Sequence, residues 1–274
     1  MLHIKRWVRR GFVYLGLVAV TMFFLLPILW ILRTSLITKV EAYKIPPNWL
    51  AQFTMENYIN IFTKGSFGTY FINSMGIGLI STVISILLGA MAAYWIARCS
   101  VRTDSIKITI LLTQMIPPVV MVIPISVIIK KLGMDDTWGA LIVSYLTFNL
   151  PYVIWMLISF FESIPSALDE ACAVDGCTKI QAYFRVVLPL AAPGIMAATV
   201  YSFIVSWNEF MFALNLTGLK SRTLPVAIAN METQQGVMIA ELCAAVMIGI
   251  IPIIILSLFI KKYLVSGLTF GSVK

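Results

Sequence analysis

The sequence predicts an all-α membrane protein with six transmembrane helices. Hydrophobic residues make up 60% of the 274 residues, charged residues make up 12%, and the mean hydropathy is +0.94. Ordinary soluble domains do not reach these values. Six apolar stretches are near or above the ~20 residues that a helix needs to cross a bilayer. They cover residues 11–36, 70–97, 106–129, 138–161, 190–214 and 240–260. Spanning strands would be about half as long and would alternate in polarity, so we expect helices, in one membrane domain over residues 1–274.

The first stretch follows the basic residues Lys5, Arg6, Arg9 and Arg10. A basic cluster before an apolar run is also typical of a secretory signal peptide. The apolar run is too long for a signal peptide, however, and no small-x-small cleavage site follows it. We therefore expect an uncleaved first span.

The distribution of Lys and Arg in the flanks predicts the orientation of the spans. On the side of the N-terminus, six spans would place Arg98, Arg102, Lys107, Lys179, Arg185, Lys261, Lys262 and Lys274. On the opposite side they would place Arg33, Lys39, Lys44, Lys64, Lys130, Lys131, Lys220 and Arg222. Because cytoplasmic loops carry the excess of these residues, we expect both termini in the cytoplasm. The basic charge belongs to these flanks, and no basic-aromatic surface indicates a nucleic-acid partner.

The third and fourth spans contain residues that disturb a regular helix. In the third span, Pro117, Pro118 and Pro124 predict kinks. In the fourth span, Pro151 frees a backbone carbonyl, and Asn149 could satisfy that carbonyl or line a path across the membrane.

A polar loop, residues 162–189, separates the fourth and fifth stretches. Pro165 suits the first turn of a helix, and Ser166 with Asp169 has the spacing of a capping box. Gly176 can end that helix in the left-handed conformation, and Thr178 can cap a second one. Two short helices in a loop of this length indicate a folded surface that docks to a partner.

The fifth stretch contains Trp207-Asn208-Glu209. An ionisable group at mid-helix costs ~2.5–3.5 kcal/mol on insertion scales, so Glu209 should face a cavity or a partner helix. An aromatic platform beside hydrogen-bonding groups would suit a sugar, whose C–H faces stack on rings. Contact between helices, or a position near the membrane boundary, is the alternative. Glu241, at the start of the last span, suits the positive end of a helix dipole.

The loop also carries Glu170-Ala171-Cys172, Gly176 and Val186-x-Leu188-Pro189. This pattern resembles the EAA signature of the membrane subunits of ATP-binding-cassette (ABC) importers, with Cys172 and Val186 in place of Ala and Ile. The resemblance implies the type I ABC importer permease fold, with a cytoplasmic EAA coupling loop that sits in a cleft of an ATPase subunit. It assigns ATPase coupling to Asp169, Glu170, Ala171, Cys172, Asp175, Gly176, Leu188 and Pro189.

The resemblance covers nearly the whole chain and is greatest to the maltose-type carbohydrate permeases. It rests on Asn73-Ser74, Pro117, Pro124, Pro151, Trp155, Trp207-Asn208-Glu209 and the tail Gly267–Lys274. The stretch from Asn73 to Arg98 and the tail look similar to trehalose-type permeases. A sugar is therefore the expected substrate, and the candidate substrate-path residues are Asn149, Trp207, Asn208 and Glu209. In maltose-type permeases an equivalent tail reaches between the ATPase subunits.

The partners that the resemblance implies are a second homologous permease, two ABC ATPase subunits, an extracytoplasmic sugar-binding protein and the lipid of a bacterial inner membrane. The chain has no P-loop, since Gly218-Leu219-Lys220-Ser221 lacks the Gly directly before Lys. We therefore expect ATP and magnesium in the partner ATPase, no cofactor bound by this chain, and no enzyme activity. With His3 as the only histidine and no CxxC pair, a metal site is not expected either.

Three alternatives remain at this stage. The importer could carry another small solute, such as a polyol or glycerol phosphate. An ion-coupled secondary transporter would need mid-membrane carboxylates and an inverted repeat; beyond Glu209 the chain offers few such groups, and it shows no repeat. A membrane enzyme would need a constellation of acids, His or Cys that the spans do not carry.

Overall fold

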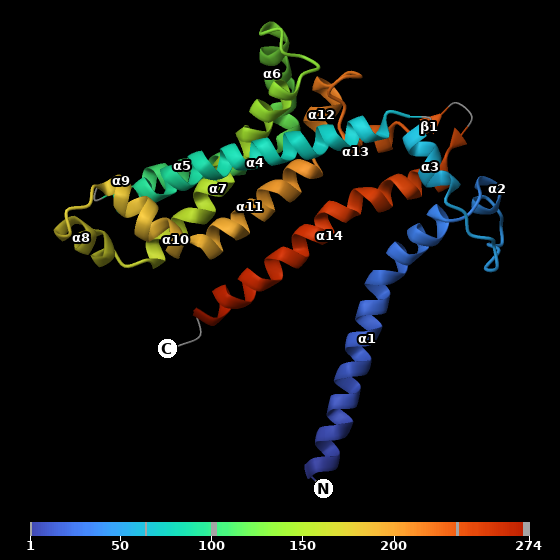
Figure 1. Ribbon diagram of the computed structural model, residues 1–274, viewed down its shortest axis with the longest axis horizontal. Coiled ribbons are helices and arrows are strands. Elements are labelled where there is room, and N and C mark those ends of the chain that lie inside the picture. The colour runs from blue at the N-terminus through green and yellow to red at the C-terminus, as the bar shows by residue number, and fades with distance from the viewer. Residues whose placement is uncertain (1, 64, 100–102, 234–235, 271–274) are drawn as a thin grey trace. The chain divides into compact units, whose positions relative to one another are not determined.

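The computed structural model describes residues 2–63, 65–99, 103–233 and 236–270, which are almost entirely helical (Figure 1). The elements are α1 (Leu2–Ser35), α2 (Lys39–Ala42), α3 (Glu56–Thr63), α4 (Phe67–Arg98), α5 (Asp104–Gln114), α6 (Pro118–Lys131), α7 (Trp138–Ser163), α8 (Ala167–Val174), α9 (Lys179–Ala182), the π-helix η1 (Tyr183–Val187), α10 (Leu188–Leu190), α11 (Ala192–Trp207), α12 (Met211–Leu216), α13 (Leu224–Ala229), the antiparallel pair β1 (Glu232–Thr233) and β2 (Gly236–Val237), and α14 (Ile239–Phe270). The chain forms two compact units, Met1–Phe67 with Ile228–Ile251, and Gly68–Ala227 with Pro252–Lys274.

Four unbroken segments in the described part of the chain are long and apolar enough to cross a membrane. They are Arg10–Ser35, Phe67–Arg98, Trp138–Ser163 and Ile239–Leu258. Two further segments pass the same test as bent pairs, α5 with α6 at 90° and Lys179–Leu190 with α11 at 77°. Six spans result if each bent pair is counted as one, which agrees with the fold class that the sequence predicts.

The bend between α5 and α6 lies at the predicted proline pair. Pro117 caps α6 and Pro118 occupies its first turn, where a missing N–H costs nothing. The prediction of a break at Pro117-Pro118 is therefore confirmed. Pro124 lies within α6 and Pro151 within α7, and both helices continue through them.

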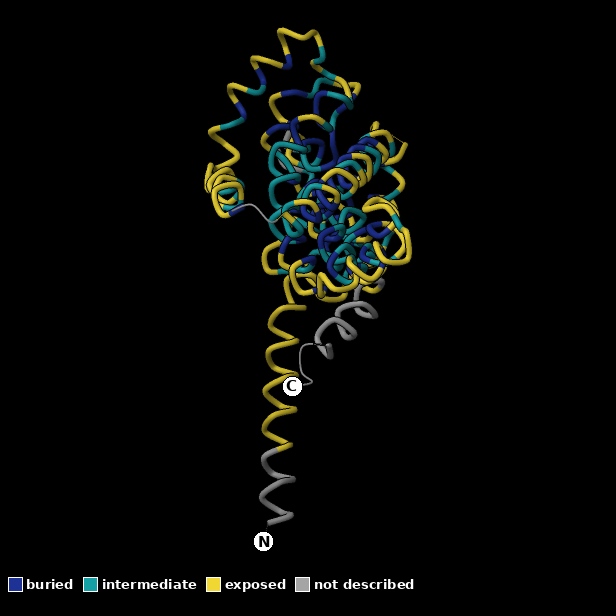
Figure 2. The backbone as a smooth tube through the Cα atoms, turned by 90° about the vertical axis from the view of Figure 1, so that its left-hand side faces the viewer, coloured by how far each residue is buried: buried dark blue, intermediate teal, exposed yellow. Residues whose placement is uncertain are grey.

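In the first unit, α1 has an almost wholly exposed apolar surface (Figure 2). None of the 18-residue window that defines its span is buried, as expected for a helix that meets lipid or another subunit. Only its last turn is fixed by other residues of the unit. There Asn57 donates from Nδ2 to the carbonyls of Ser35 and Ile37, at 2.9 and 2.7 Å. Glu241 lies in the first turn of α14, as expected, and accepts a hydrogen bond from Asn60 at 3.2 Å.

In the second unit, α7 packs against both α5 and α11, and α6 packs against α12. Two buried apolar clusters fill the spaces between these helices and α4. One surrounds Leu157 and Phe161 and the other surrounds Leu141 and Phe212. At Gly89 of α4, an added Cβ would lie 2.6 Å from Cγ1 of Val153 on α7. Small residues of this kind allow membrane helices to approach closely.

The segment that leads from α9 into α10 is a π-helix, η1. Tyr183 and Val187, at its two ends, are both buried in the cluster around Phe161. The bend at Ala191 then starts α11.

Candidate functional site

The loop that carries the EAA-like signature folds as the short helix α8. Its first turn is closed by backbone hydrogen bonds, from Leu168 N to Pro165 O at 3.2 Å and from Asp169 N to Ser166 O at 2.9 Å. The predicted capping box is wrong, because Ser166 has helical backbone angles and its hydroxyl makes no capping bond. The Asp169 carboxylate, which that box would have used, turns instead to α4.

The end of α8 agrees with the sequence. Gly176 has a φ of +78°, the left-handed conformation predicted for it, and its N–H donates to Ala173 O at 3.1 Å. Thr178 caps α9 through a complete capping box with Gln181. The two short helices and the turn at Gly176 are therefore confirmed, and the loop has a fixed local structure.

The surface of the loop combines acidic and apolar side chains. Glu170, Ala171, Asp175 and Gly176 are exposed. Val174 is 88% exposed and Ile180 is 64% exposed, which is unusual for aliphatic side chains unless another surface covers them. Cys172 is buried against the chain's own helices. Further along, Leu188 packs against the cluster around Phe161 and Pro189 is exposed in α10, at the bend and outside the docking loop proper.

A polar cluster that the sequence did not indicate fixes α8 to the rest of the unit. Arg98, in the last turn of α4, donates from Nε to Oδ2 of Asp169 at 2.7 Å. Its two terminal nitrogens donate to the carbonyls of Phe161 (3.0 Å) and Ile164 (2.9 Å) at the end of α7. Tyr94 donates to Oδ1 of Asp169 at 2.7 Å. We call these five residues the Arg98 clamp. The sequence shows Arg98 only as a flanking charge, and its partners lie more than 60 positions away.

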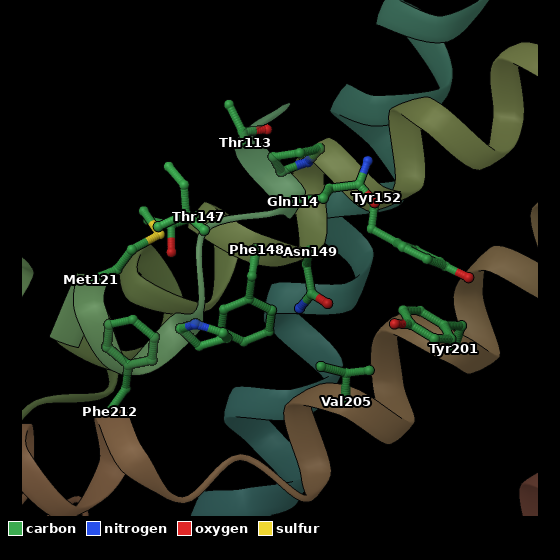
Figure 3. Close-up of a pocket in the computed structure, with 13 residues that line it drawn as sticks. Thr113, Gln114, Met121, Thr147, Phe148, Asn149, Tyr152, Tyr201, Val205 and Phe212 are labelled. Atoms are coloured by element: carbon green, nitrogen blue, oxygen red, sulfur yellow. The ribbon is translucent and has the colours of Figure 1, made fainter. Parts of the chain in front are cut away.

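A second candidate region is a cavity of about 190 Å³ between α7, α11 and the break from α5 to α6 (Figure 3). Gln114, Thr147, Asn149, Tyr152 and Tyr201 are among its lining residues. The rings of Tyr152 and Tyr201 stack with their centroids 3.7 Å apart. Asn149 is the one predicted path residue that lines this cavity, and it also donates to Ser206 Oγ on α11 at 2.7 Å.

The other three predicted path residues occupy different environments. Trp207 is 3% exposed and packs between Phe203 and Phe71. Asn208 is exposed and donates to the carbonyl of Ile204 at 2.8 Å. Glu209 accepts hydrogen bonds from the N–H groups of the first turn of α12, at 2.8 and 3.1 Å. Its carboxylate therefore caps a helix, and the aromatic face of Trp207 lies within protein.

At the other end of the unit, residues 217–223 are fixed by what we call the Asp136 clasp. Oδ1 of Asp136 accepts from Gly218 N at 2.8 Å and from both N and Oγ of Ser221, at 2.9 and 2.8 Å, and Oδ2 accepts from Lys220 N at 3.3 Å. Burial alone would raise the pKa of Asp136, but these hydrogen bonds lower it to about 2. Asn73 adds bonds to the carbonyls of Lys220 and Arg222, both at 2.9 Å.

The spans, the break at the prolines and the folded loop after α7 define a multi-span membrane permease subunit. Residues 85–269 match the family described as "Binding-protein-dependent transport system inner membrane component". The chain belongs to this family, the permease subunits of ABC importers, and it is an inner-membrane component. Its homologues are transport components without catalytic activity, as expected from the sequence.

Similar proteins extend over nearly the whole chain. The trehalose transport system permease protein SugB of Mycobacterium tuberculosis is 42% identical over 256 residues, 91% of this chain and 92% of that protein. The trehalose/maltose transport system permease protein MalG of Thermococcus litoralis is 32% identical, with 97% of each chain covered. A chain from the crystal structure of a bacterial ABC transporter involved in the import of alginate has the same fold, with a TM-score of 0.77, 21% identity and coverage of 94% of this chain and 96% of that one.

Proposed function

We propose that this chain is one of two homologous permeases in an ATP-driven sugar importer. The observation that carries the proposal is the capped helix α8, whose exposed edge bears the EAA-like residues Glu170 and Ala171 beside the uncovered aliphatic side chain of Val174. A rigid surface element with this composition suits a partner's cleft, because apolar contact supplies affinity and charge supplies orientation. The names of the relatives, which include trehalose and maltose permeases, support a sugar as the cargo.

Coupling would pass through this loop. Closure of an ATPase dimer on ATP would move the two coupling loops of the permease pair, and the packed helices would turn the path from inward-facing to outward-facing. The ATPase subunits would supply ATP and magnesium, and this chain would bind neither. An extracytoplasmic sugar-binding protein would deliver the cargo to the opposite face, and both termini would lie in the cytoplasm of a bacterium. The tail after Phe270, a second candidate contact for the ATPase, lies outside the described residues.

The cavity beside Asn149 is the best candidate for this chain's share of the sugar path. Stacked tyrosine rings offer an apolar face for the C–H groups of a sugar, and Asn149, Gln114 and Thr147 offer hydrogen-bonding groups. Gln114 is suited to such a role because its Nε2 is buried and has no hydrogen-bond partner. The volume of about 190 Å³ is below the ~300–1,000 Å³ of complete ligand pockets. A second permease would then supply the rest of the site.

Two other cargoes or mechanisms compete with this proposal. A polyol or glycerol phosphate would use the same architecture, and the cavity offers no lysine or arginine for a phosphate among its lining residues. An ion-coupled secondary transporter would require no ATPase. Its clearest candidate carboxylate, Glu209, is already used to cap α12.

The first test is to purify the chain from its native membranes in mild detergent and to identify the bound proteins by mass spectrometry. We expect stoichiometric recovery of a P-loop ATPase and of a second permease with an EAA loop. A folded chain recovered alone would contradict the importer and favour a secondary transporter. Uptake of labelled trehalose, maltose and glycerol phosphate by the recovered complex in proteoliposomes would then identify the cargo class.

A further inference from the structure

We propose that Arg98 is a positioning residue that ties the coupling helix α8 to α4, so that a movement of the loop is transmitted to this long helix directly. The inference rests on the proposed function and adds to it a path for the force. The chain connects the loop covalently only to α7 at one end and to α9 at the other. Without a further link, α4 would follow the loop only through the packing of its neighbours.

The first support is the geometry of the guanidinium. Arg98 belongs to α4, and its three donor groups reach Asp169 on α8 and two carbonyls, Phe161 O and Ile164 O, at the end of α7. One rigid planar group therefore joins three elements. Lysine has one ammonium nitrogen on a flexible stem and could not make three divergent bonds with the same geometry.

The second support is the space around the clamp. A cavity of about 590 Å³ is lined by residues of α4, including Trp95 and Cys99, and by residues of the loop, including Glu170 and Lys179. The helix α8 packs against α9 and η1. Between α8 and α4 the clamp is accordingly a polar bridge beside an open cavity, and the connection depends on a few charge-assisted bonds.

The third support is burial. The side chains of Arg98 and Asp169 are 14% and 21% exposed, so water competes little for their charges. Tyr94, which holds the second oxygen of Asp169, is itself 3% exposed and packs against Tyr183 and Phe161, with ring centroids 4.9 and 5.8 Å apart. The clamp therefore stands on an aromatic cluster formed by α4, η1 and α7, and a displacement of α8 loads all three.

The test compares Arg98→Lys, Asp169→Asn and Tyr94→Phe in the assembled transporter in proteoliposomes. The informative quantity is the number of ATP molecules hydrolysed per sugar imported. A purely structural defect lowers hydrolysis and import together, whereas a broken transmission raises this ratio. For Arg98→Lys and Asp169→Asn we expect the ratio to rise about tenfold, as for loss of a charge-assisted hydrogen bond. Tyr94→Phe should raise it only about two- to threefold, because the ion pair remains.

The matched control is Lys107→Gln. Lys107 pairs with Glu162 and so joins α5 to the end of α7 without touching α8, and its loss should leave the ratio unchanged. In the double variant Arg98→Lys/Asp169→Asn, the ratio should equal that of either single variant, since both remove the same link. Should Arg98→Lys fail to accumulate, Asp169→Asn and Tyr94→Phe still decide the question through their expected order.

Two results would overturn the proposal. A wild-type ratio in Asp169→Asn would show that α4 does not depend on the clamp. Loss of ATPase binding in the clamp variants, with an unchanged ratio in the complexes that remain, would assign these residues to docking. Failure of the proposed function looks different, because then the unmodified chain would not retain an ATPase at all.

Discussion

Replacing Asp136 by asparagine would remove the charge from the clasp that holds residues 217–223 and leave the backbone nearly undisturbed. Asp136 has a φ of 51°, a left-handed conformation that asparagine also adopts readily. The new amide would keep one oxygen, but its NH₂ group would face the N–H groups of Gly218, Lys220 or Ser221, which require an acceptor. The substitution thus tests the carboxylate itself.

The pKa of Asp136 sets the magnitude. It lies at about 2, against an ordinary value of 3.8, which corresponds to about 2 kcal/mol of folding free energy. Because the side chain is partly open to water, we expect about 1–2 kcal/mol, roughly a tenfold change in the opening equilibrium of the loop. A lowered pKa means that this stabilisation is fully present above pH ~4 and is lost as the pH falls through about 2.

Hydrogen exchange of the amides of residues 218–221 in detergent measures this equilibrium locally. At neutral pH, Asp136→Asn should lower their protection about tenfold. Between pH 4 and pH 2 the wild-type protein should lose protection that the variant does not have to lose. Asp135→Asn is the matched control, because Asp135 is the exposed neighbour of Asp136. Equal protection in Asp136→Asn and the wild type at neutral pH would refute the reasoning.

Three further predictions concern the loop, the cavity and the packing. Gly176→Pro and Glu170→Lys should abolish transport but not membrane insertion, measured by uptake and by membrane fractionation; Gly133→Pro is the control for backbone strain, since Gly133 also has a positive φ, of 65°, but lies outside the loop. Tyr201→Ala should raise the sugar concentration for half-maximal import about tenfold if the stacked pair contacts the cargo, and an unchanged value would remove the cavity from the path. Gly89→Leu should lower the thermal stability of the purified protein, because its Cβ alone would lie 2.6 Å from a methyl group of Val153; a melting temperature equal to that of the wild type would contradict the close approach of α4 and α7.

The parts of the structure that follow from local chemistry could be predicted from the sequence. Hydrophobic length fixes the spans, Pro117-Pro118 fixes the break before α6, and Gly176 with Thr178 fixes the turn after α8. In each case, the residues that determine the feature lie within a few positions of it. The capping box at Ser166 failed although it is local, because Asp169 has a stronger partner in Arg98.

The features that require partners far apart in the chain could not be predicted from one sequence. Asp136 and its partners Gly218 and Ser221 are more than 80 positions apart. Glu209 illustrates the same limit, because a carboxylate in an apolar stretch indicates that it needs polar partners without indicating which. In the structure those partners are the backbone N–H groups of the next helix.

The π-helix η1 makes the length of the chain matter at one point. A π-turn accommodates an extra residue relative to an α-helical turn, and here it lets Tyr183 and Val187 both reach the buried cluster around Phe161. Deleting a single residue between positions 183 and 187 would let the segment relax to a regular α-helix. Each residue of an α-helix turns the chain by about 100°, so the docking loop would be swung around the axis of α10 by roughly that angle. Chain length in these five residues therefore sets the direction in which the exposed edge of α8 points.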